Sequence, residues 1–244
     1  HQQHALLRRG AVVVDLGAAP GGWSQAASRA IGAAGLVIGV DRCPITPLSL
    51  AEAGAGSAPV VFLLGDCTAQ ATLAALRREV TARRGGGADT ACHVDAVISD
   101  MAPSFAGDAS TDTANQMWLA WTALTVAQQL LRVGGSFVVK VRYGEHYRAF
   151  LAATRRRFQR VWEEKPPASR AASPEAFLVA TGFLLPPAPA AAVTASQVAV
   201  AGGSAESMEY ALDAALAVWR AATPAASVAA DRGAAAAFGV SLLF

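Results

Sequence analysis

The sequence is short of cysteine, histidine and lysine, and it has no long apolar run. Its 3 cysteines and 4 histidines are scattered over 244 residues, with no CxxC pair and no histidine spacing typical of metal ligands. We therefore expect no metal site and no disulfide framework, and a reducing compartment is the default. No apolar stretch approaches the roughly 18–20 residues that cross a bilayer, so we expect no membrane span.

Excess charge of one sign is lacking as well. The net charge is only +2, so bulk charge does not hold this chain to nucleic acid, and such a role requires a local basic face. Among the 20 basic residues only Lys140 and Lys165 are lysines. In an arginine-rich chain, a remaining lysine indicates a site that needs an amine able to lose its proton, which arginine cannot do. Chance explains the same composition equally well.

Short β-rich runs alternate with longer helical stretches, which is typical of a parallel sheet wrapped by helices. The predicted strands are Ala11–Asp15, Leu36–Asp41, Val60–Gly65, Val94–Asp100 and Ser136–Val141, followed by a hairpin-type pair at Arg160–Glu164 and Ala176–Gly182. The predicted helices are Gly22–Ile31, Ala69–Arg83, Thr113–Leu131 and Tyr147–Phe158. We expect an α/β fold with a mostly parallel, seven-stranded sheet and helices on both faces.

The character of the chain changes after Gly182. Residues 1–183 are predicted to form one domain, residues 184–203 a Pro/Ala-rich linker, and residues 204–244 an Ala-rich helical extension. Ser204 is typical of a helix N-cap, and an apolar stripe on one face of the 204–222 helix would pack on the domain or on a protein partner. That stripe consists of Met208, Leu212, Leu216 and Trp219.

Five ionisable residues lie at the carboxyl ends of five predicted strands: Asp15, Asp41, Asp66, Asp100 and Lys140. In an open parallel sheet these ends meet at one edge, where ligands bind. A single charge at a strand end is commonly a cap or a turn former. Five charges along one edge, each ending an apolar run, favour a binding site.

Asp15 is followed by a loop of small residues that leads into a predicted helix. Glycines in such a loop let the backbone approach a ligand closely, and the next helix begins with unpaired N–H groups. Ala19 occupies the second glycine position of GxGxxG, which argues against a dinucleotide, and no Gly-Lys-Ser/Thr follows. The candidate ligand-binding residues of this loop are Gly17, Ala18, Pro20, Gly21, Gly22 and Trp23.

Two further acids suit a nucleoside. Asp41 ends the second predicted strand, where an acid can accept hydrogen bonds from the two ribose hydroxyls. Asp66 ends the third and could accept a hydrogen bond from an adenine amino group, although an ordinary turn explains Asp66 as well. Together with the loop, they describe an adenosine ligand without a pyrophosphate, which is S-adenosylmethionine (SAM).

These residues resemble the FtsJ/RrmJ-type family of RNA ribose 2′-O-methyltransferases over about residues 10–183. The matching runs are Val14-Asp-Leu-Gly-Ala-Ala-Pro-Gly-Gly-Trp-Ser-Gln25, Gly65-Asp66, Ser99-Asp-Met-Ala-Pro103 with Gly107, Gly134-Gly-Ser-Phe-Val-Val-Lys-Val141, Lys165-Pro, Ser169-Arg-Ala-Ala-Ser-Pro-Glu-Ala-Phe177 and Val179-Ala-Thr-Gly182. The resemblance implies a Rossmann-like SAM-dependent methyltransferase fold, with SAM as the cofactor and no metal. The SAM-contacting positions would be the loop residues with Asp15, Asp41, Asp66 and Asp100.

The family uses a Lys-Asp-Lys-Glu tetrad. By motif position, Asp100 matches its aspartate, Lys140 its second lysine and Glu175 its glutamate. The first lysine would lie upstream of Gly10, and His1–Arg9 contains none, so full activity of this chain is in question. We expect Lys140 to act as general base on the ribose hydroxyl, within the apolar run Phe137-Val-Val-Lys-Val141, while Asp100 and Glu175 orient Lys140 and the ribose.

The RNA would be held by basic residues around Lys140. The candidates are Arg142, Arg155, Arg156, Arg157, Arg160, Lys165 and Arg170, whose side chains can bind phosphates without reading sequence. The Ser-Asp-Met-Ala-Pro motif resembles the branch that acts on large-subunit ribosomal RNA, which implies a uridine target within a pre-large ribosomal subunit. The Ala-rich loops and the C-terminal extension favour a mitochondrial relative, with a cytoplasmic bacterial enzyme as the alternative.

Three other interpretations stay open. The chain could be a non-catalytic or weakly active ribosome-assembly factor that uses a methyltransferase fold for docking. It could also be a tRNA 2′-O-methyltransferase. A base or small-molecule methyltransferase is the third, because Asp100-Met-Ala-Pro103 distantly resembles the Asp/Asn-Pro-Pro-aromatic motif of amino-group methylases, although Phe105 is wrongly placed for it.

Overall fold

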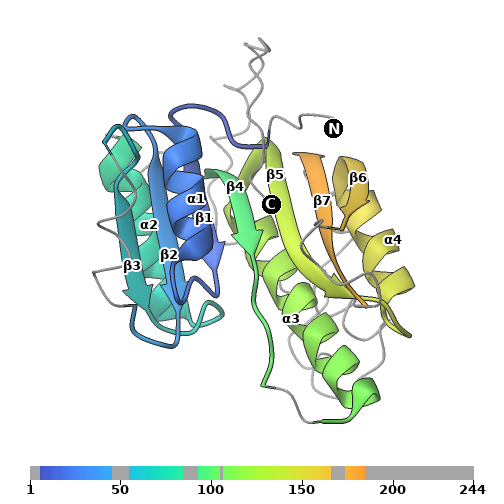
Figure 1. Cartoon of the computed structure of the whole chain (residues 1–244). Helices are drawn as coiled ribbons and strands as arrows, with labels where there is room; N and C mark the ends of the chain where they lie inside the picture. Colours follow the sequence, from blue (N-terminus) through green and yellow to red (C-terminus); the bar gives the residue numbers. More distant parts are fainter. Residues whose placement is uncertain (1–5, 46–54, 85–92, 105–106, 166–173, 185–244) are drawn as a thin grey trace, which may run out of the picture.

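A computed structural model of the chain describes residues 6–45, 55–84, 93–104, 107–165 and 174–184. These residues form one seven-stranded sheet in the order β3-β2-β1-β4-β5-β7-β6 (Figure 1). The strands are β1 (Val12–Leu16), β2 (Leu36–Asp41), β3 (Val60–Leu64), β4 (Val94–Ser99), β5 (Leu131–Arg142), β6 (Phe158–Glu164) and β7 (Glu175–Phe183). The helices are α1 (Gly22–Ile31), α2 (Gln70–Arg84), α3 (Ala109–Leu130) and α4 (Tyr147–Arg157).

The sheet is mostly parallel, as predicted. Strands β3, β2, β1, β4 and β5 pair in parallel, so their carboxyl ends meet at one edge. The antiparallel ending is also present, but β7 inserts between β5 and β6 and pairs antiparallel with both. The hairpin-type pattern in the sequence does not specify this insertion, because it contains no information on which neighbour β7 joins.

The predicted boundaries agree with the structure within a residue or two for most elements, and two differ more. Helix α3 begins at Ala109 rather than Thr113, because the Asp108 carboxylate accepts a hydrogen bond from Thr111 N at 2.8 Å and caps the helix. Strand β5 begins at Leu131 rather than Ser136. Its pairing with β4 shifts register between Val94 and Ala96, and this irregularity takes up the intervening glycines within the strand.

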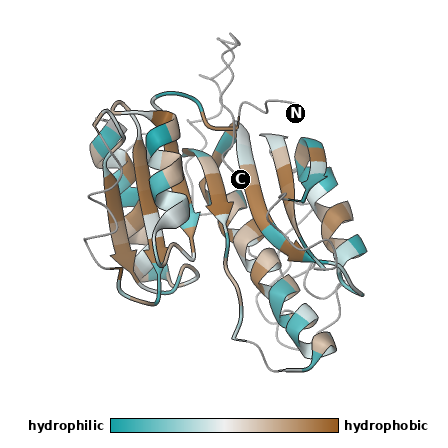
Figure 2. Cartoon of the chain, in the orientation of Figure 1, coloured by the Kyte–Doolittle hydropathy of each residue, from teal (hydrophilic) through white to brown (hydrophobic). Residues whose placement is uncertain are grey.

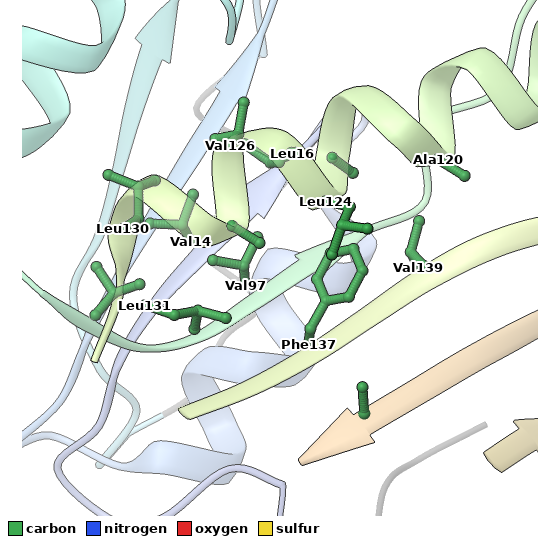
Figure 3. Close-up of a cluster of buried hydrophobic side chains, with 14 of the residues drawn as sticks. Val14, Leu16, Val97, Ala120, Leu124, Val126, Leu130, Leu131, Phe137 and Val139 are labelled. Carbon is green, nitrogen blue, oxygen red and sulfur yellow. The ribbon is translucent and has the colours of Figure 1, made fainter. Parts of the chain in front are cut away.

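Helices cover both faces of the sheet. One buried cluster joins the strands to α2, α3 and α4, and a second joins the opposite face to α1 and to Leu6 and Leu7. Figure 2 shows the hydrophobic colouring concentrated on the strands. Figure 3 shows how Leu124 and Leu130 of α3 pack over Val97 and Phe137 of the sheet. The two layers hold the strand ends rigidly, and that rigid edge carries the candidate site.

Part of the sequence-based interpretation lies outside the described residues. It includes almost all of the 184–203 linker, the 204–244 extension with its apolar stripe, and Arg170. Among the residues that the structure describes, no helix combines the length and apolar character needed to cross a membrane.

Candidate active site

The edge formed by the carboxyl ends of the strands carries the five predicted ionisable residues. Asp15 and Asp41 lie in β1 and β2, Lys140 lies in β5, and Asp66 and Asp100 follow β3 and β4. Asp41, Asp66, Asp100 and Lys140 line one cavity of about 710 Å³. That volume lies within the range of small-molecule sites, about 300–1,000 Å³. The structure therefore brings four of the five residues to one cavity, and the fifth, Asp15, is fully buried in β1.

The loop after β1 is fastened to the end of β2. Gly17 N and Ala18 N donate to Val40 O at 2.9 and 3.2 Å, and Ala19 N donates to Asp41 Oδ2 at 2.9 Å. Loops that bind phosphate present free backbone N–H groups to the ligand. Because three successive N–H groups of this loop are already bonded within the protein, this part of the loop offers no phosphate cradle. This agrees with a nucleoside ligand that has no pyrophosphate.

Gly17 is the loop residue whose backbone requires glycine most clearly. Its φ is +76°, which side chains rarely adopt, and a Cβ there would lie 3.1 Å from the Met101 Cα atom. The absence of a side chain therefore lets β1 and the segment after β4 approach each other closely. Among the candidate loop residues, Gly17 lines the cavity.

The rest of the predicted loop set lies elsewhere. Ala18 is buried, Pro20 is exposed, Gly21 is the N-cap of α1, and Gly22 begins that helix. The Trp23 ring packs on Phe177 of β7, with ring centroids 5.1 Å apart. None of these five is among the residues that line the cavity. They shape the turn and its packing, and direct contact with a ligand stays a prediction for them.

Asp15 is fully buried beneath the site. Ser24 Oγ donates to its Oδ2 at 2.6 Å, and Oδ1 accepts no hydrogen bond from any residue that the structure describes. Burial raises the pKa of Asp15 from 3.8 to about 7; Ser24 opposes the rise, while the charges of Asp100 and Asp41 add to it. Asp15 is not among the residues that line the cavity, so its direct contact with a ligand stays a prediction.

Asp41 and Asp66 are both held by backbone N–H groups. Asp41 accepts from Ala19 N through Oδ2 and from Cys43 N through Oδ1 at 2.7 Å. Asp66 Oδ1 accepts from Thr68 N and Thr68 Oγ1 at 2.8 and 2.6 Å, and these bonds lower the pKa of Asp66. Asp66 is thus a turn residue, as the alternative interpretation expected, and it also lines the cavity. Each carboxylate keeps lone pairs for ligand hydroxyl or amino groups.

Lys140 and Asp100 form an ion pair at the cavity wall. Lys140 Nζ lies 2.5 Å from Asp100 Oδ1, and the side chains are 16% and 34% exposed. The geometry is not that of a hydrogen bond, since Asp100 Oδ1 lacks a hydrogen-bond partner within the described residues. We therefore describe the contact as a charge pair. An amine that is mostly buried and borders a ligand cavity can exchange a proton with a bound hydroxyl.

Gln116 of α3 joins the two strands that carry this pair, and the sequence did not indicate it. Its buried amide Nε2 donates to Met101 O at 2.9 Å and to Lys140 O at 3.4 Å. Met101 follows Asp100 directly, so one side chain ties together the backbones next to both charged residues. Nothing in the spacing of Gln116 reveals this contact, because it depends on where α3 crosses the sheet.

Glu175 lies near Lys140 but not opposite it. Lys140 is paired across the antiparallel ladder with Phe177, and Glu175 is paired with Arg142. Glu175 is therefore the diagonal neighbour of Lys140 on the same face, where such Cβ atoms are typically about 7 Å apart. This placement agrees with an orienting role toward a substrate that lies between them.

The structure divides the predicted RNA-binding residues into separate groups. Arg142 ends β5 and Lys165 follows β6, so both lie at the same edge as Lys140. Helix α4 runs back across the sheet and carries Arg155 and Arg156 toward the opposite edge. Arg160 pairs with Thr181 of β7, four residues along that strand from Phe177, the partner of Lys140. These three arginines therefore lie away from Lys140.

The prediction for Arg157 is wrong. Its side chain is 5% exposed, and Nε donates to Gln128 Oε1 of α3 at 2.7 Å while Nη1 donates to Ala153 O. A guanidinium that is buried and bonded between two helices is not available to a phosphate. The sequence showed three consecutive arginines, Arg155 to Arg157, but not that the last faces α3.

Several cavity residues were missed from the sequence. Asn115, Trp118, Leu119 and Thr122 present one face of α3 to the cavity, and Arg42, Cys67 and Met101 line it from the strand ends. The four α3 residues have the helical spacing i, i+3, i+4, i+7. The buried side of α3 has the same period, so the spacing alone does not show which side faces the cavity. Met101 lies inside the Ser-Asp-Met-Ala-Pro motif and could have been proposed. Among the described residues, no group of three or more His, Cys, Asp or Glu side chains is placed to hold a metal ion.

Known proteins resemble this chain in sequence and in fold. A family model described as FtsJ-like methyltransferase matches residues 1–183. A structure described as a ribosomal RNA methyltransferase from Plasmodium falciparum has a TM-score of 0.56 and 22% identity, covering 73% of this chain and 89% of that one. An rRNA-methylase structure from Clostridium thermocellum has a TM-score of 0.47 and 18% identity, covering 73% and 91%. Fibrillarin from Aeropyrum pernix with bound SAM has a TM-score of 0.49 and 16% identity, covering 72% and 68%. At these identities, the likeness to the Plasmodium structure supports the methyltransferase fold.

Proposed function

Because the chain belongs to the FtsJ-like methyltransferase family, we propose that it transfers a methyl group from SAM to a ribose 2′-hydroxyl of RNA. The observation that carries the proposal is the Lys140–Asp100 ion pair at 2.5 Å. It stands on the wall of the cavity that Asp41 and Asp66 also line. Carboxylates that suit an adenosine ligand and a largely buried amine therefore border one space, which supports a ribose methylation.

SAM is the methyl donor, and the residues fit it. Asp41 would accept hydrogen bonds from the ribose hydroxyls, and Asp66 would accept one from the adenine amino group through its Oδ2 atom. The loop N–H groups at Gly17, Ala18 and Ala19 are occupied, which suits a ligand without phosphates. When bound, SAM supplies a methyl group on a positively charged sulfur.

Lys140 handles the proton of the nucleophile. To act as the base, Lys140 would first release the proton of its ammonium form to solvent; the neutral Nζ would then accept the 2′-hydroxyl proton as the ribose oxygen takes up the methyl group that bound SAM would supply. The resulting ammonium lies beside Asp100, which stabilises its charge. Glu175, diagonal to Lys140, orients the ribose. A positioned base of this kind contributes a factor of about 10²–10⁴ to the rate.

We further propose a uridine of large-subunit ribosomal RNA as the target, with action on a pre-large subunit in mitochondria. Support for the RNA class comes from the Ser99-Asp-Met-Ala-Pro103 motif and from the likeness to the Plasmodium structure, which is described as a ribosomal RNA methyltransferase. Arg142 and Lys165, which lie at the edge with Lys140, would contact the phosphates next to the target.

The test is methyl transfer from labelled SAM to large-subunit RNA by the wild type, Lys140→Ala and Lys140→Arg. Nuclease P1 digestion and mass spectrometry then locate the methyl group. We expect a ribose methyl from the wild type and a loss of about 100-fold or more in kcat for both variants. Retained affinity for S-adenosylhomocysteine (SAH), measured by calorimetry, shows that each variant is folded.

Three results would contradict the proposal in distinct ways. Unchanged activity of Lys140→Ala would remove Lys140 from the chemistry. A methyl group on a base would refute the ribose assignment. A wild-type protein that binds SAH and immature subunits but transfers no methyl group would favour the assembly factor.

A further inference from the structure

Tyr143 is an exposed aromatic residue held in a fixed orientation at the sheet edge that carries Lys140. It follows β5 directly, three residues after Lys140. Its side chain is 40% exposed, and among the described residues few large hydrophobic side chains are exposed to this extent. Burial does not explain a large ring in that position, so its exposed face is available to a partner.

Three contacts hold the Tyr143 ring in place. Its hydroxyl donates to Glu163 Oε2 of β6 at 2.7 Å, and its backbone N–H donates to Pro174 O at 3.0 Å. The ring meets Tyr147 of α4 edge to face, with centroids 5.0 Å apart and planes at 80°. A ring that is already oriented loses little conformational freedom on binding, which favours affinity.

The charges around Tyr143 select the chemistry of that partner. The Glu163 carboxylate accepts a hydrogen bond from the Tyr143 hydroxyl, and Glu145, two residues after Tyr143, is exposed. Carboxylates repel phosphate groups, so the Tyr143 ring itself does not suit a phosphate, and phosphate contacts are left to Arg142 and Lys165. Stacking of a nucleobase on an aromatic ring needs no cation and is tolerant of sequence. A neutral base face therefore fits the Tyr143 surface better than a phosphate does.

We propose that Tyr143 is a stacking platform for an RNA base next to the target nucleotide. The inference rests on the proposed function and names how the substrate is held there. Three residues of extended chain span at most about 10 Å, so Tyr143 lies at the same strand end as Lys140. Its ring contacts Glu163, whose ladder row faces the other side of the sheet from the row of Lys140, so a base on Tyr143 belongs to a nucleotide that passes round this edge from the ribose. Stacking on this ring adds to the phosphate contacts of Arg142 and Lys165.

The test measures binding of a labelled single-stranded RNA that contains the target, by fluorescence anisotropy in the presence of SAH. Tyr143→Leu removes the ring, Tyr143→Phe keeps it, and Val133→Ala alters an exposed apolar residue near the start of β5, at the opposite edge. We expect Tyr143→Leu to weaken binding about 10-fold, with Tyr143→Phe and Val133→Ala close to wild type. The slope of log Kd against log salt should not change for Tyr143→Leu, whereas Lys165→Gln should reduce it.

A second measurement uses the wild-type protein with RNA that lacks one base beside the target. Such abasic RNA should bind the wild type about as weakly as intact RNA binds Tyr143→Leu, and the two losses should not add. Additive losses, or equal weakness of Tyr143→Phe and Tyr143→Leu, would overturn the platform. Tight RNA binding unaffected by Tyr143→Leu, with ribose methylation intact, would refute this inference alone. Absence of any RNA binding by the wild type would overturn the proposed RNA substrate as well.

Discussion

Asp15→Asn should remove a pH-dependent loss of stability that the buried carboxyl causes. The side chain is fully buried, accepts one hydrogen bond from Ser24, and leaves Oδ1 without a partner among the described residues. Its pKa is about 7 in the folded protein, against the ordinary value of 3.8. Between these values the folded state binds the proton more tightly than the unfolded state, so stability is highest at low pH, falls as the pH rises to about 7, and is level above it.

The magnitude follows from those two pKa values. The full effect is roughly 4 kcal/mol, because one pH unit corresponds to about 1.36 kcal/mol. Part of the loss has already occurred at pH 5, so about 2.5 kcal/mol of it falls between pH 5 and pH 8. Asparagine has the same shape and does not titrate, so this position should contribute no pH dependence to the stability of the variant. It keeps an acceptor for Ser24, although its amide N–H groups have no evident partner in the wild-type geometry.

The assay is urea unfolding of the ligand-free protein, followed by circular dichroism, at intervals from pH 5 to pH 8. The difference in unfolding free energy between Asp15→Asn and the wild type should shift in favour of the variant by about 2.5 kcal/mol over this range. Other titrating groups are common to both proteins and cancel in the difference. Ser24→Ala should steepen the wild-type dependence, because it removes the bond that opposes the pKa rise. A difference that stays constant with pH would show that Asp15 does not titrate in this window.

Three further changes test other parts of the structure. Gln116→Met removes the donor to Met101 O and Lys140 O. Because misplacement of Lys140 affects the chemical step, kcat should fall about 10-fold while KM for SAM changes little. An equal rise in KM would contradict this. Asp108→Ala removes the α3 N-cap and should lower the midpoint of urea unfolding; an unchanged midpoint would contradict this. Arg157→Met leaves Gln128 Oε1 unpaired and should cost about 1–3 kcal/mol, with unchanged RNA affinity in anisotropy; weaker RNA binding would restore Arg157 to the interface.

Local patterns in the sequence were sufficient for most of the elements. Helix α1 and β2 have the predicted bounds, because period, small loop residues and charged strand ends all mark the same positions. The start of α3 was missed, although Asp108 three residues before Thr111 is a readable cap. The start of β5 could not be read from the sequence, because Gly134 and Gly135 are typical of a turn. They stay within the strand only because the pairing of β5 with β4 shifts register at this point.

The sequence alone determined that acids and a lysine end parallel strands, and hence that they meet at one edge with a loop built for close approach. That inference needs only strand direction and spacing, which are local properties. The tertiary structure decided the rest: the insertion of β7 between β5 and β6, the burial of Asp15 and Arg157, and the link from Gln116 to the backbones of Met101 and Lys140. Each of these depends on which faces of distant elements meet, and a side chain's burial and hydrogen bonds are properties of that packing rather than of its own segment.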